Sequence, residues 1–400
     1  CPDLNVNVVD KNESRLESWN SKDLSKLPVY EKGLDKLIKK CRGKNLHFSN
    51  DLEKHISEAD MIFISVNTPT KNKGVGAGQA SDLKWIDASS REIAKYANGR
   101  TIVVEKSTLP VRTAQTIKEI LDGSQKINNK KQFTVLSNPE FLAEGTAIND
   151  LENPDRVLIG GDDEESINAL VKIYLKWIKP QKIITTNLWS SELSKLTANA
   201  FLAQRISSIN SISALCEETG ADIKDVSKAI GTDSRIGTHF LNAGPGFGGS
   251  CFKKDILNLV YICNHYGLNE VADYWQKVVD INNWQKERIS QLIVQKLFGT
   301  LSNKKIAILG YAFKANTNDS RESPAIKICK ELLNEGGHIC IYDPQVTQNQ
   351  IHTDLNLPPR LEDPKAKHDN DDGFWTYSET AMHAIEKSDA IVILTEWEEF

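Results

Sequence analysis

The sequence is poor in the features that mark several protein classes. No apolar run approaches the roughly 20 residues that span a bilayer, and the polar first residues do not resemble a secretion signal. Lys and Arg number 49 against 54 Asp and Glu, so the net charge is −5. This balance gives no basic face for a polyanion. We therefore expect no membrane span and no nucleic-acid partner.

Cysteine is scarce and irregularly placed. Seven cysteines occur in 400 residues, without CxxC spacing. An odd, scattered set argues against a disulfide framework or a zinc site and favours a reducing compartment. We expect a cytoplasmic protein without a metal. His368 and its acidic neighbours carry metal-binding groups, but residues 349–376 are interpreted as a solvated surface insertion.

A glycine-rich dinucleotide loop is also missing. Residues 6–10 have the pattern of a strand that ends in an acid, which normally lies about 20 residues beyond such a loop. A second copy of the pattern has a strand at 305–310 and an acid, Asp343, about 33 residues later. The spacing predicts that roughly 25 residues are missing before Cys1. No element follows the last strand, at 388–397, so we expect a fragment truncated at both ends.

Apolar strands that alternate with helices predict the fold. In the first half the strands are expected at 59–66, 101–105, 134–137 and 156–161, with helices at 83–96 and 112–121. This alternation is typical of α/β proteins with parallel sheets, which bind ligands at the carboxyl ends of their strands. We predict two Rossmann-like, doubly wound domains, at 1–189 and 301–400. A central region, 190–300, joins them through a long helix that starts with the capping pattern of residues 190–193.

A glycine-rich loop at 243–250 leads into a helix that begins near Cys251. The positive end of a helix dipole favours thiolate over thiol, and Asp255 follows one turn later. This arrangement suits covalent catalysis, but an incidental cysteine or a phosphate-binding loop explains it as well. Lys195 and Asn199 share a helix face and suit an oxyanion, whereas a simple connecting or dimer helix is the alternative. Arg235 fits either an anion or a surface charge.

Six motifs then occur in one order along nearly the whole chain. They are residues 65–70 (SVNTPT), 105–108 (EKST), 138–145 (NPEFLAEG), 191–196 (SELSKL), 246–252 (GFGGSCF) and 310–314 (GYAFK). Through them the chain resembles the UDP-glucose/GDP-mannose dehydrogenase family, and within it the animal-type members. The resemblance implies an NAD-binding domain, a dimerising central helix, a UDP-binding domain and a hexamer built from dimers. It also implies oxidation of UDP-glucose to UDP-glucuronate by two NAD⁺ in turn.

The resemblance gives each motif residue a role. Cys251 would be the nucleophile that carries the sugar as a thiohemiacetal and then as a thioester. Lys195 and Asn199 would stabilise the oxyanion, and Asp255 would accept protons or orient water. Glu140 would act in thioester hydrolysis, with Thr108 holding the water.

Two binding sets follow from the same resemblance. For NAD it implies Asp10, Arg15, Val66, Asn67, Thr68, Pro69, Thr70, Ser107, Thr108, Leu109, Glu144, Cys251, Phe252, Lys253, Lys254 and Arg321. For UDP-glucose it implies Glu140, Phe141, Leu142, Ala143, Glu144, Lys195, Asn199, Arg235, Asn242, Ala243, Gly244, Pro245, Gly246, Phe247, Gly248, Phe313 and Lys314.

The chain departs from the family pattern at both ends. It lacks the glycine loop that holds the NAD pyrophosphate and a substrate-binding arginine beyond Phe400, so we expect weak NAD binding and little turnover. Two rival functions stay open. A sister dehydrogenase would act on GDP-mannose or UDP-N-acetylmannosamine, and a silent nucleotide-sugar-binding or oligomerisation module would keep the fold without using Cys251.

Overall fold

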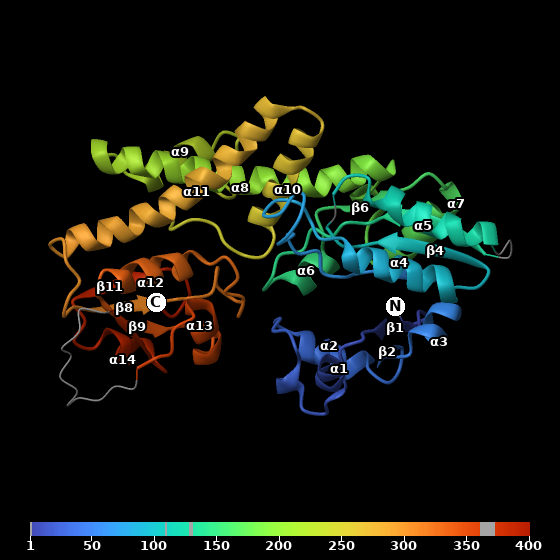
Figure 1. The fold of residues 1–400 in the computed structure, drawn as a ribbon, viewed down its shortest axis with the longest axis horizontal. Helices are drawn as coiled ribbons and strands as arrows, with labels where there is room; N and C mark the ends of the chain where they lie inside the picture. Colours follow the sequence, from blue (N-terminus) through green and yellow to red (C-terminus); the bar gives the residue numbers. More distant parts are fainter. Residues whose placement is uncertain (1, 109, 128–130, 361–372) are drawn as a thin grey trace. The chain divides into compact units, whose positions relative to one another are not determined.

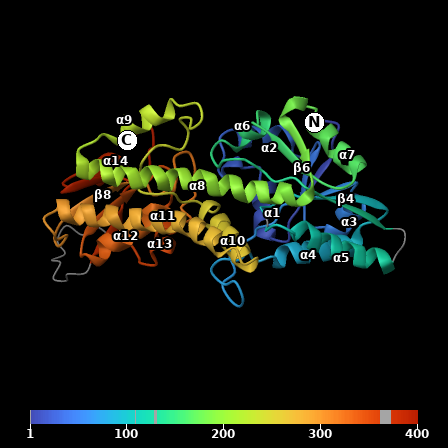
Figure 2. The ribbon, with the colours of Figure 1, turned by 90° about the horizontal axis from the view of Figure 1, so that it is seen from above.

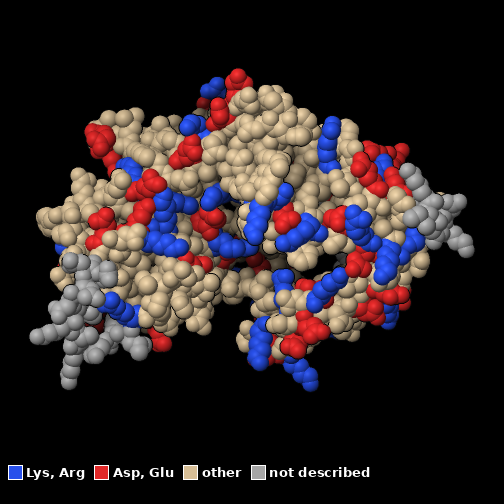
Figure 3. Space-filling view, in the orientation of Figure 1, with Lys and Arg blue, Asp and Glu red and all other residues tan. Residues whose placement is uncertain are grey.

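The computed structural model describes residues 2–108, 110–127, 131–360 and 373–400 (Figure 1). The chain forms two compact units, Cys1–Ala198 and Asn199–Phe400. Helices of the described residues include none that is both long and apolar enough to cross a membrane. Acidic and basic side chains are interspersed over the visible face of each unit (Figure 3).

The first unit is built on a five-stranded sheet of order β3-β4-β5-β6-β7. The strands are β3 (Met61–Ile64), β4 (Arg100–Glu105), β5 (Gln132–Ser137), β6 (Val157–Gly160) and β7 (Ile183–Thr186). All neighbours are parallel except β5 and β6, which pair antiparallel at Ser137 and Gly160. The helices that follow these strands are α4 (Lys84–Tyr96), α5 (Thr113–Ile127), α6 (Ala147–Glu152), α7 (Glu164–Tyr174) and the short η2 (Pro180–Lys182).

Alternation along β4 explains why both faces of this sheet are covered. Val103 packs with the buried face of α4 and α5, whereas the next residue, Val104, packs with Leu170 of α7. Successive side chains of a strand point to opposite faces, so a continuous apolar run requires helices on both sides. The parallel strands β3, β4 and β5 therefore place their polar carboxyl ends at one edge of the sheet.

A separate two-stranded sheet precedes β3. It pairs β1 (Val6–Val9) with β2 (Leu46–Ser49) in parallel, from Val6 opposite Leu46 to Val9 opposite Ser49. The connecting helices are α1 (Glu13–Asn20), η1 (Leu24–Lys26) and α2 (Leu34–Cys41), and α3 (Leu52–Ser57) leads on to β3. The predicted strand that ends before Asp10 is therefore present.

Four helices form the next region. They are α8 (Leu188–Thr219), α9 (Ile223–Gly231), α10 (Phe252–His265) and α11 (Asn269–Lys296). Figure 2 shows α8 as one continuous helix. Within the second unit, Ser207 of α8 donates a hydrogen bond to the Val278 carbonyl of α11 at 2.8 Å. Ala200 and Ala203 of α8 pack with Ile256 and Leu259 of α10 and with Val279 of α11 in one buried cluster.

The second unit ends in a four-stranded parallel sheet of order β10-β9-β8-β11. The strands are β8 (Lys305–Leu309), β9 (His338–Tyr342), β10 (Phe374–Tyr377) and β11 (Ala390–Ile393), with helices α12 (Pro324–Asn334), α13 (Gln348–Leu355) and α14 (Ala381–Ile385). Ile306, Ile308 and Trp375 are fully buried at the centre of its core.

The predicted fold class, α/β with parallel-dominated sheets and a long central helix, is confirmed. Two details are wrong. The central helix begins at Leu188 rather than at Ser190. Its cap is Asn187, whose side-chain oxygen accepts the amide of Ser190 at 2.8 Å. Residues 349–376, predicted to be a surface insertion, contain most of α13, and Ile351 of this helix is buried in the core of the second unit. His368 lies outside the described residues. The division at 189 and 300 stays a prediction.

Candidate active site

Two predicted NAD segments meet at the carboxyl ends of β3 and β4. The Ser107 hydroxyl donates to the Val66 carbonyl at 2.8 Å and accepts the Val66 amide at 3.0 Å. The Thr68 hydroxyl donates to the Thr108 carbonyl at 3.0 Å. The segments that contain residues 66–70 and 107–108 are therefore joined, as parallel strands require. Leu109 lies outside the described residues.

The other predicted NAD residues of this unit include Asp10, directly after β1. Its Oδ1 accepts the amide of Asn12 at 2.9 Å, and its Oδ2 lies 3.8 Å from the Arg15 guanidinium. The carboxylate is about one-third exposed. An accessible acid at the end of a parallel strand has the chemistry that holds ribose hydroxyls, so the residues present fit a dinucleotide.

A cavity of about 290 Å³ lies beyond the carboxyl end of β5. Glu140, Phe141 and Leu142 line it, together with Lys106 and Arg156. Arg156 stacks on the Phe141 ring, with 3.8 Å from its guanidinium carbon to the ring centre. The predicted substrate residues 140–142 thus share one cavity.

Lys195 of α8 approaches the same group of residues. Its Nζ lies 5.3 Å from the centre of the Phe141 ring. Burial lowers the pKa of Lys106 to about 8; the charge of Glu140 opposes this shift and that of Lys195 adds to it. Glu140, Lys106 and Lys195 therefore form one electrostatic cluster within the first unit.

Asn138 and Tyr174 anchor this cavity, although neither was assigned a role from the sequence. Asn138 Oδ1 accepts the Tyr174 hydroxyl at 2.6 Å and Lys106 Nζ at 3.3 Å, while its Nδ2 donates to the Leu158 carbonyl at 2.8 Å. Burial raises the pKa of Tyr174 to about 12, so its hydroxyl stays a donor. The only sequence signal was the position of Asn138 inside the 138–145 motif.

Residues 143–145 continue into a turn held by two acids. The Ala143 amide donates to Asp150, and the amides of Gly145 and Ala147 donate to the two oxygens of Glu31, each at 2.9 Å. Glu144 lies in this turn. Glu31 lies more than 100 residues away in sequence, so no local pattern predicts its contact.

The glycine-rich loop of the second unit is shaped by close packing. A Cβ on Gly246, whose φ is +120°, would lie 2.7 Å from the Asn282 side-chain oxygen. A Cβ on Gly248 would lie 2.7 Å from the Glu322 carbonyl, and Gly249 would meet the Phe313 ring at 2.9 Å. The Gly249 amide also donates to the Arg321 carbonyl at 2.8 Å. Glycine is required at these positions because neighbouring side-chain and backbone atoms leave no room for a Cβ.

Buried amide side chains hold the loop from the helices behind it. Asn282 Oδ1 accepts the Phe247 amide at 2.7 Å, and its Nδ2 returns a bond to the Phe247 carbonyl. Gln285 donates to the Gly244 carbonyl and Asn210 accepts the Gly244 amide, both at 2.9 Å. These residues were missed; amides three apart on the inner face of α11 were the available signal.

Cys251 directly precedes α10 and is exposed. Its carbonyl accepts the amide of Asp255 at 2.9 Å, and its Sγ lies 3.5 Å from the Ser250 hydroxyl. Asp255 is buried; its Oδ2 accepts Asn199 Nδ2 at 2.6 Å and its Oδ1 lies 3.7 Å from Lys254 Nζ. Cys251, Asp255 and Asn199 are thus brought together within the second unit.

The remaining predicted residues are placed as follows. Lys253, one residue after Phe252, donates to Glu322 at 2.9 Å. The exposed Arg235 pairs with Asp233 at 2.6 Å, and Arg321 pairs with Asp319. Lys314 lies 5.6 Å from the Phe313 ring centre. Asn242, Ala243 and Pro245 lie in the loop that carries Gly244 and Gly246.

The six predicted catalytic residues are divided between the units. Thr108, Glu140 and Lys195 belong to the first, and Asn199, Cys251 and Asp255 to the second. The described cysteines are all free, and the described part of the chain contains no cluster of three or more His, Cys, Asp or Glu placed to hold a metal ion.

Comparison with known proteins identifies the group to which this chain belongs. Three domains of the UDP-glucose/GDP-mannose dehydrogenase family match it: the NAD-binding domain at residues 2–178, the central domain at 189–284 and the UDP-binding domain at 307–400. The chain is 55% identical to the UDP-glucose 6-dehydrogenase of Bos taurus over 404 residues, covering all of this chain and 80% of the bovine protein. It is 55% identical to that of Drosophila melanogaster, covering 83% of the fly protein.

A solved structure extends the likeness. The UDP-glucose dehydrogenase of Pyrobaculum islandicum matches with a TM-score of 0.85 and 29% identity, over 98% of this chain and 85% of the archaeal one. The matched relatives are NAD-dependent oxidoreductases, and the chain carries the NAD-binding domain of their family. The protein is a member of the UDP-glucose/GDP-mannose dehydrogenase family.

Proposed function

We propose that this protein oxidises UDP-glucose to UDP-glucuronate in two hydride transfers to NAD⁺, with the sugar held on Cys251 between them. The observation that carries the proposal is the position of Cys251 at the end of the glycine loop and the start of α10, one turn from the buried pair of Asp255 and Asn199. Identity of 55% to UDP-glucose 6-dehydrogenases over the whole chain supports the choice of sugar.

NAD⁺ would be held by Asp10 and by the joined segments around Val66 and Ser107. When bound, it accepts a hydride from the sugar in each oxidation. In the first oxidation the C6 carbon gives up one hydride, Asp255 accepts the proton of the C6 hydroxyl, and an aldehyde is left. Lys195 stabilises the oxygen anion as the proton leaves, with Asn199 as a second donor.

Cys251 makes the second oxidation feasible. Its thiolate attacks the aldehyde carbon, forming a C–S bond and a thiohemiacetal whose carbon still carries one hydrogen. The oxyanion formed in this step takes a hydrogen bond from Asn199, whose amide is oriented by Asp255. Loss of a second hydride to a second NAD⁺ gives a thioester.

Water then releases the product. Glu140 accepts a proton from the water, which Thr108 holds, and the C–S bond breaks to return the Cys251 thiolate and free the carboxylate. The sum is one alcohol, one water and two NAD⁺ giving one carboxylate, two NADH and three protons. A base in the cavity lined by residues 140–142 supports this assignment.

The finer binding and assembly assignments belong to the same proposal. The remaining predicted residues, including Arg235, Phe313 and Lys314, hold UDP-glucose. Chains pair through α8, which exposes Trp189, Phe201 and Leu215, and three such dimers form a hexamer in the cytoplasm. The weak NAD affinity and the three-domain division also stay predictions.

The test is covalent trapping. The protein is incubated with UDP-glucose and NAD⁺, denatured in acid and digested, and the peptide that carries Cys251 is weighed by mass spectrometry. We expect the mass of a UDP-glucuronyl thioester, and none in Cys251→Ser, which serves as the matched control. An adduct only with GDP-mannose or UDP-N-acetylmannosamine would favour a sister dehydrogenase. No adduct with any sugar would favour a silent binding module.

A further inference from the structure

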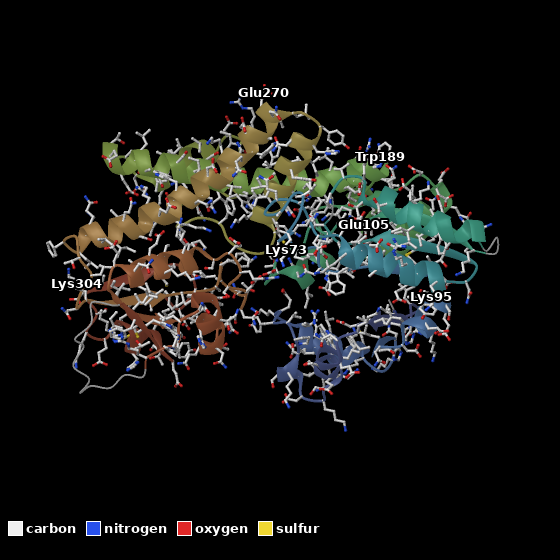
Figure 4. All side chains as sticks on the ribbon, in the orientation of Figure 1. Lys73, Lys95, Glu105, Trp189, Glu270 and Lys304 are labelled. Atoms are coloured by element: carbon white, nitrogen blue, oxygen red, sulfur yellow. The ribbon has the colours of Figure 1, made fainter. Side chains whose placement is uncertain are left out.

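Two carboxyl groups meet in the interior of the first unit. Glu105 ends β4 and is 1% exposed; Glu192 lies in the first turns of α8 and is 2% exposed. Figure 4 labels Glu105 within this unit. No described lysine or arginine forms an ion pair with either acid. Two acids in such a site are expensive, because burial penalises each charge and the charges repel.

The surroundings decide which acid is ionised. Glu192 accepts the Arg112 amide through Oε2 and the Ala114 amide through Oε1, both at 2.7 Å. Two oxygens that each accept an N–H are typical of a carboxylate. Glu105 instead has the Glu192 carboxylate and the Ser137 hydroxyl of β5 as neighbours. Of the two acids, Glu105 is therefore the one assigned the proton, with Glu192 as the acceptor of its hydrogen bond.

The pKa shifts of Glu105 and Glu192 agree with this assignment of the proton. Burial, followed by the Glu192 charge, raises the pKa of Glu105 well above its usual range. Burial raises the pKa of Glu192 to about 7. The hydrogen bonds from the amides of Ala114, Arg112 and Thr113 and from Glu105 lower this pKa and so limit the shift. The groups that face Glu192 are thus one acid of β4 and the amides at the start of α5.

The two acids lie at the two ends of one segment. Glu105 immediately precedes residues 106–112, and Glu192 binds the amides of Arg112 and Ala114, where that segment enters α5. Arg112 has a φ of +78°, which is unusual for a residue with a side chain and requires support from its surroundings. Ser107 and Thr108 lie within the segment.

We propose that Glu192 is a positioning residue for NAD⁺ binding: its carboxylate, sharing the proton of Glu105, fixes both ends of segment 106–112 and thereby the Ser107 and Thr108 groups. This role rests on the proposed function, since it assigns those two residues to NAD⁺ and water. Glu192 also lies three residues before Lys195 on α8, so one helix turn carries both the clamp and the predicted oxyanion donor.

The test compares Glu192→Gln with Glu105→Gln. A glutamine at 105 donates an N–H to Glu192 as the acid does, so the clamp survives. A glutamine at 192 offers one oxygen for two amides and turns an NH₂ group against the other. Amide hydrogen exchange is measured from pH 5.5 to 8.5 in peptides that cover Arg112 to Ala114. The exchange rates are expressed as protection factors, relative to the unfolded chain at the same pH. Affinity for NAD⁺ is measured by titration.

We expect Glu192→Gln to lower the protection of these amides by about tenfold or more at pH 8 and to weaken NAD⁺ binding about fivefold. Glu105→Gln should stay within about twofold of the parent in both. In the parent and in Glu105→Gln, protection should fall as the pH drops through about 7, because Glu192 gains a proton there. In Glu192→Gln it should not depend on pH.

Three results would overturn the proposal. Protection that stays flat with pH in the parent would mean that the Glu192 carboxylate does not hold the two amides, and this measurement stands even if Glu192→Gln fails to fold. Equal loss in both variants reduces the pair to a packing feature. Lost protection with unchanged NAD⁺ affinity removes the positioning role. None of these depends on trapping a thioester, whose absence would instead contradict the reaction.

Discussion

The two units contain corresponding strand pairs that differ in what lies beside them. In the second unit β9 pairs with β10 on one side and β8 on the other, and β8 also pairs with β11. In the first unit β1 pairs with β2, and β3 pairs with β4, but no described strand joins β1 to β3. The position that β8 occupies between β9 and β11 thus has no described counterpart between β1 and β3.

The acids at the ends of β9 and β1 have different surroundings. Asp343 is 3% exposed, and its carboxylate accepts five hydrogen bonds, from the amides of Tyr311, Ala312, Gln345 and Val346 and the indole of Trp397. Asp10 accepts one amide and is 32% exposed. Asp343 is therefore held in place by the donors around it, whereas the Asp10 carboxylate is accessible to a ligand.

The largest expected effect comes from replacing these acids. Asp343→Asn leaves one oxygen for five donors and points an NH₂ group at some of them. Because hydrogen bonds to a buried charge are strong and unpaired donors are costly, we expect the second unit to lose about 3 kcal/mol or more. Asp10→Asn, the matched control, should change stability by less than about 0.5 kcal/mol. Urea unfolding followed by fluorescence of both variants measures the difference.

Equal losses from the two substitutions would contradict the comparison. It would mean that Asp10 has structural partners equivalent to those of Asp343.

A second substitution pair examines the strands themselves. Ile308 of β8 is fully buried, whereas Val8 of β1 is 37% exposed. Ile308→Thr places a hydroxyl in an apolar core and removes a methyl group, which should cost about 2–3 kcal/mol. Val8→Thr keeps the β-branched shape on a face open to solvent and should cost less than about 0.5 kcal/mol. Thermal melts give the order; a cost above 1 kcal/mol at Val8 would show that its face is covered in solution.

The comparison also shows what the sequence could predict. Continuous apolar runs located β3, β4, β8 and β9, and the position of Cys251 before α10 followed from glycines preceding a periodic apolar helix. The strands β2, β7 and β10 were missed, because each mixes apolar with polar residues instead of forming a continuous apolar run. Glu192 was interpreted as part of a helix cap; its contacts with Arg112 and Ala114 are set by the fold, since those residues lie about 80 positions away.

The same limit applies to the candidate site. Motif order indicated which residues matter, and the structure brings residues 66–70 to 107–108 and Asn199 to Asp255. The groups that hold these motifs, such as Asn282 and Glu31, lie far from them in sequence. Their amide and carboxylate side chains are common on helices and in loops, so only the tertiary structure distinguishes them.

The smallest predicted effect concerns one lysine in each unit whose pKa is lowered. Burial lowers the pKa of both Lys286 and Lys106 to about 8. The negative charge of Glu322 opposes the shift at Lys286, and that of Glu140 opposes it at Lys106. Lys286 is buried in the second unit and donates to the Glu322 carbonyl at 3.3 Å, whereas Lys106 lines an open cavity. A depressed lysine pKa means that the unfolded chain binds more protons between pH 8 and about 10.4, so stability rises with pH across that window.

Lys286→Met removes the cost of burying this charge, so the variant should gain about 1–2 kcal/mol at pH 7 and show a flatter rise between pH 8 and 10. Lys106→Met should gain less, because that ammonium group lines an open cavity and the substitution also removes its hydrogen bond to Asn138. Urea unfolding at pH 7 and 9.5 measures both. A destabilised Lys286→Met would mean that its bond to Glu322, which holds that residue at a φ of +56°, outweighs the cost of burial. The buried lysine would then belong with Asp343 as a structural group of the second unit.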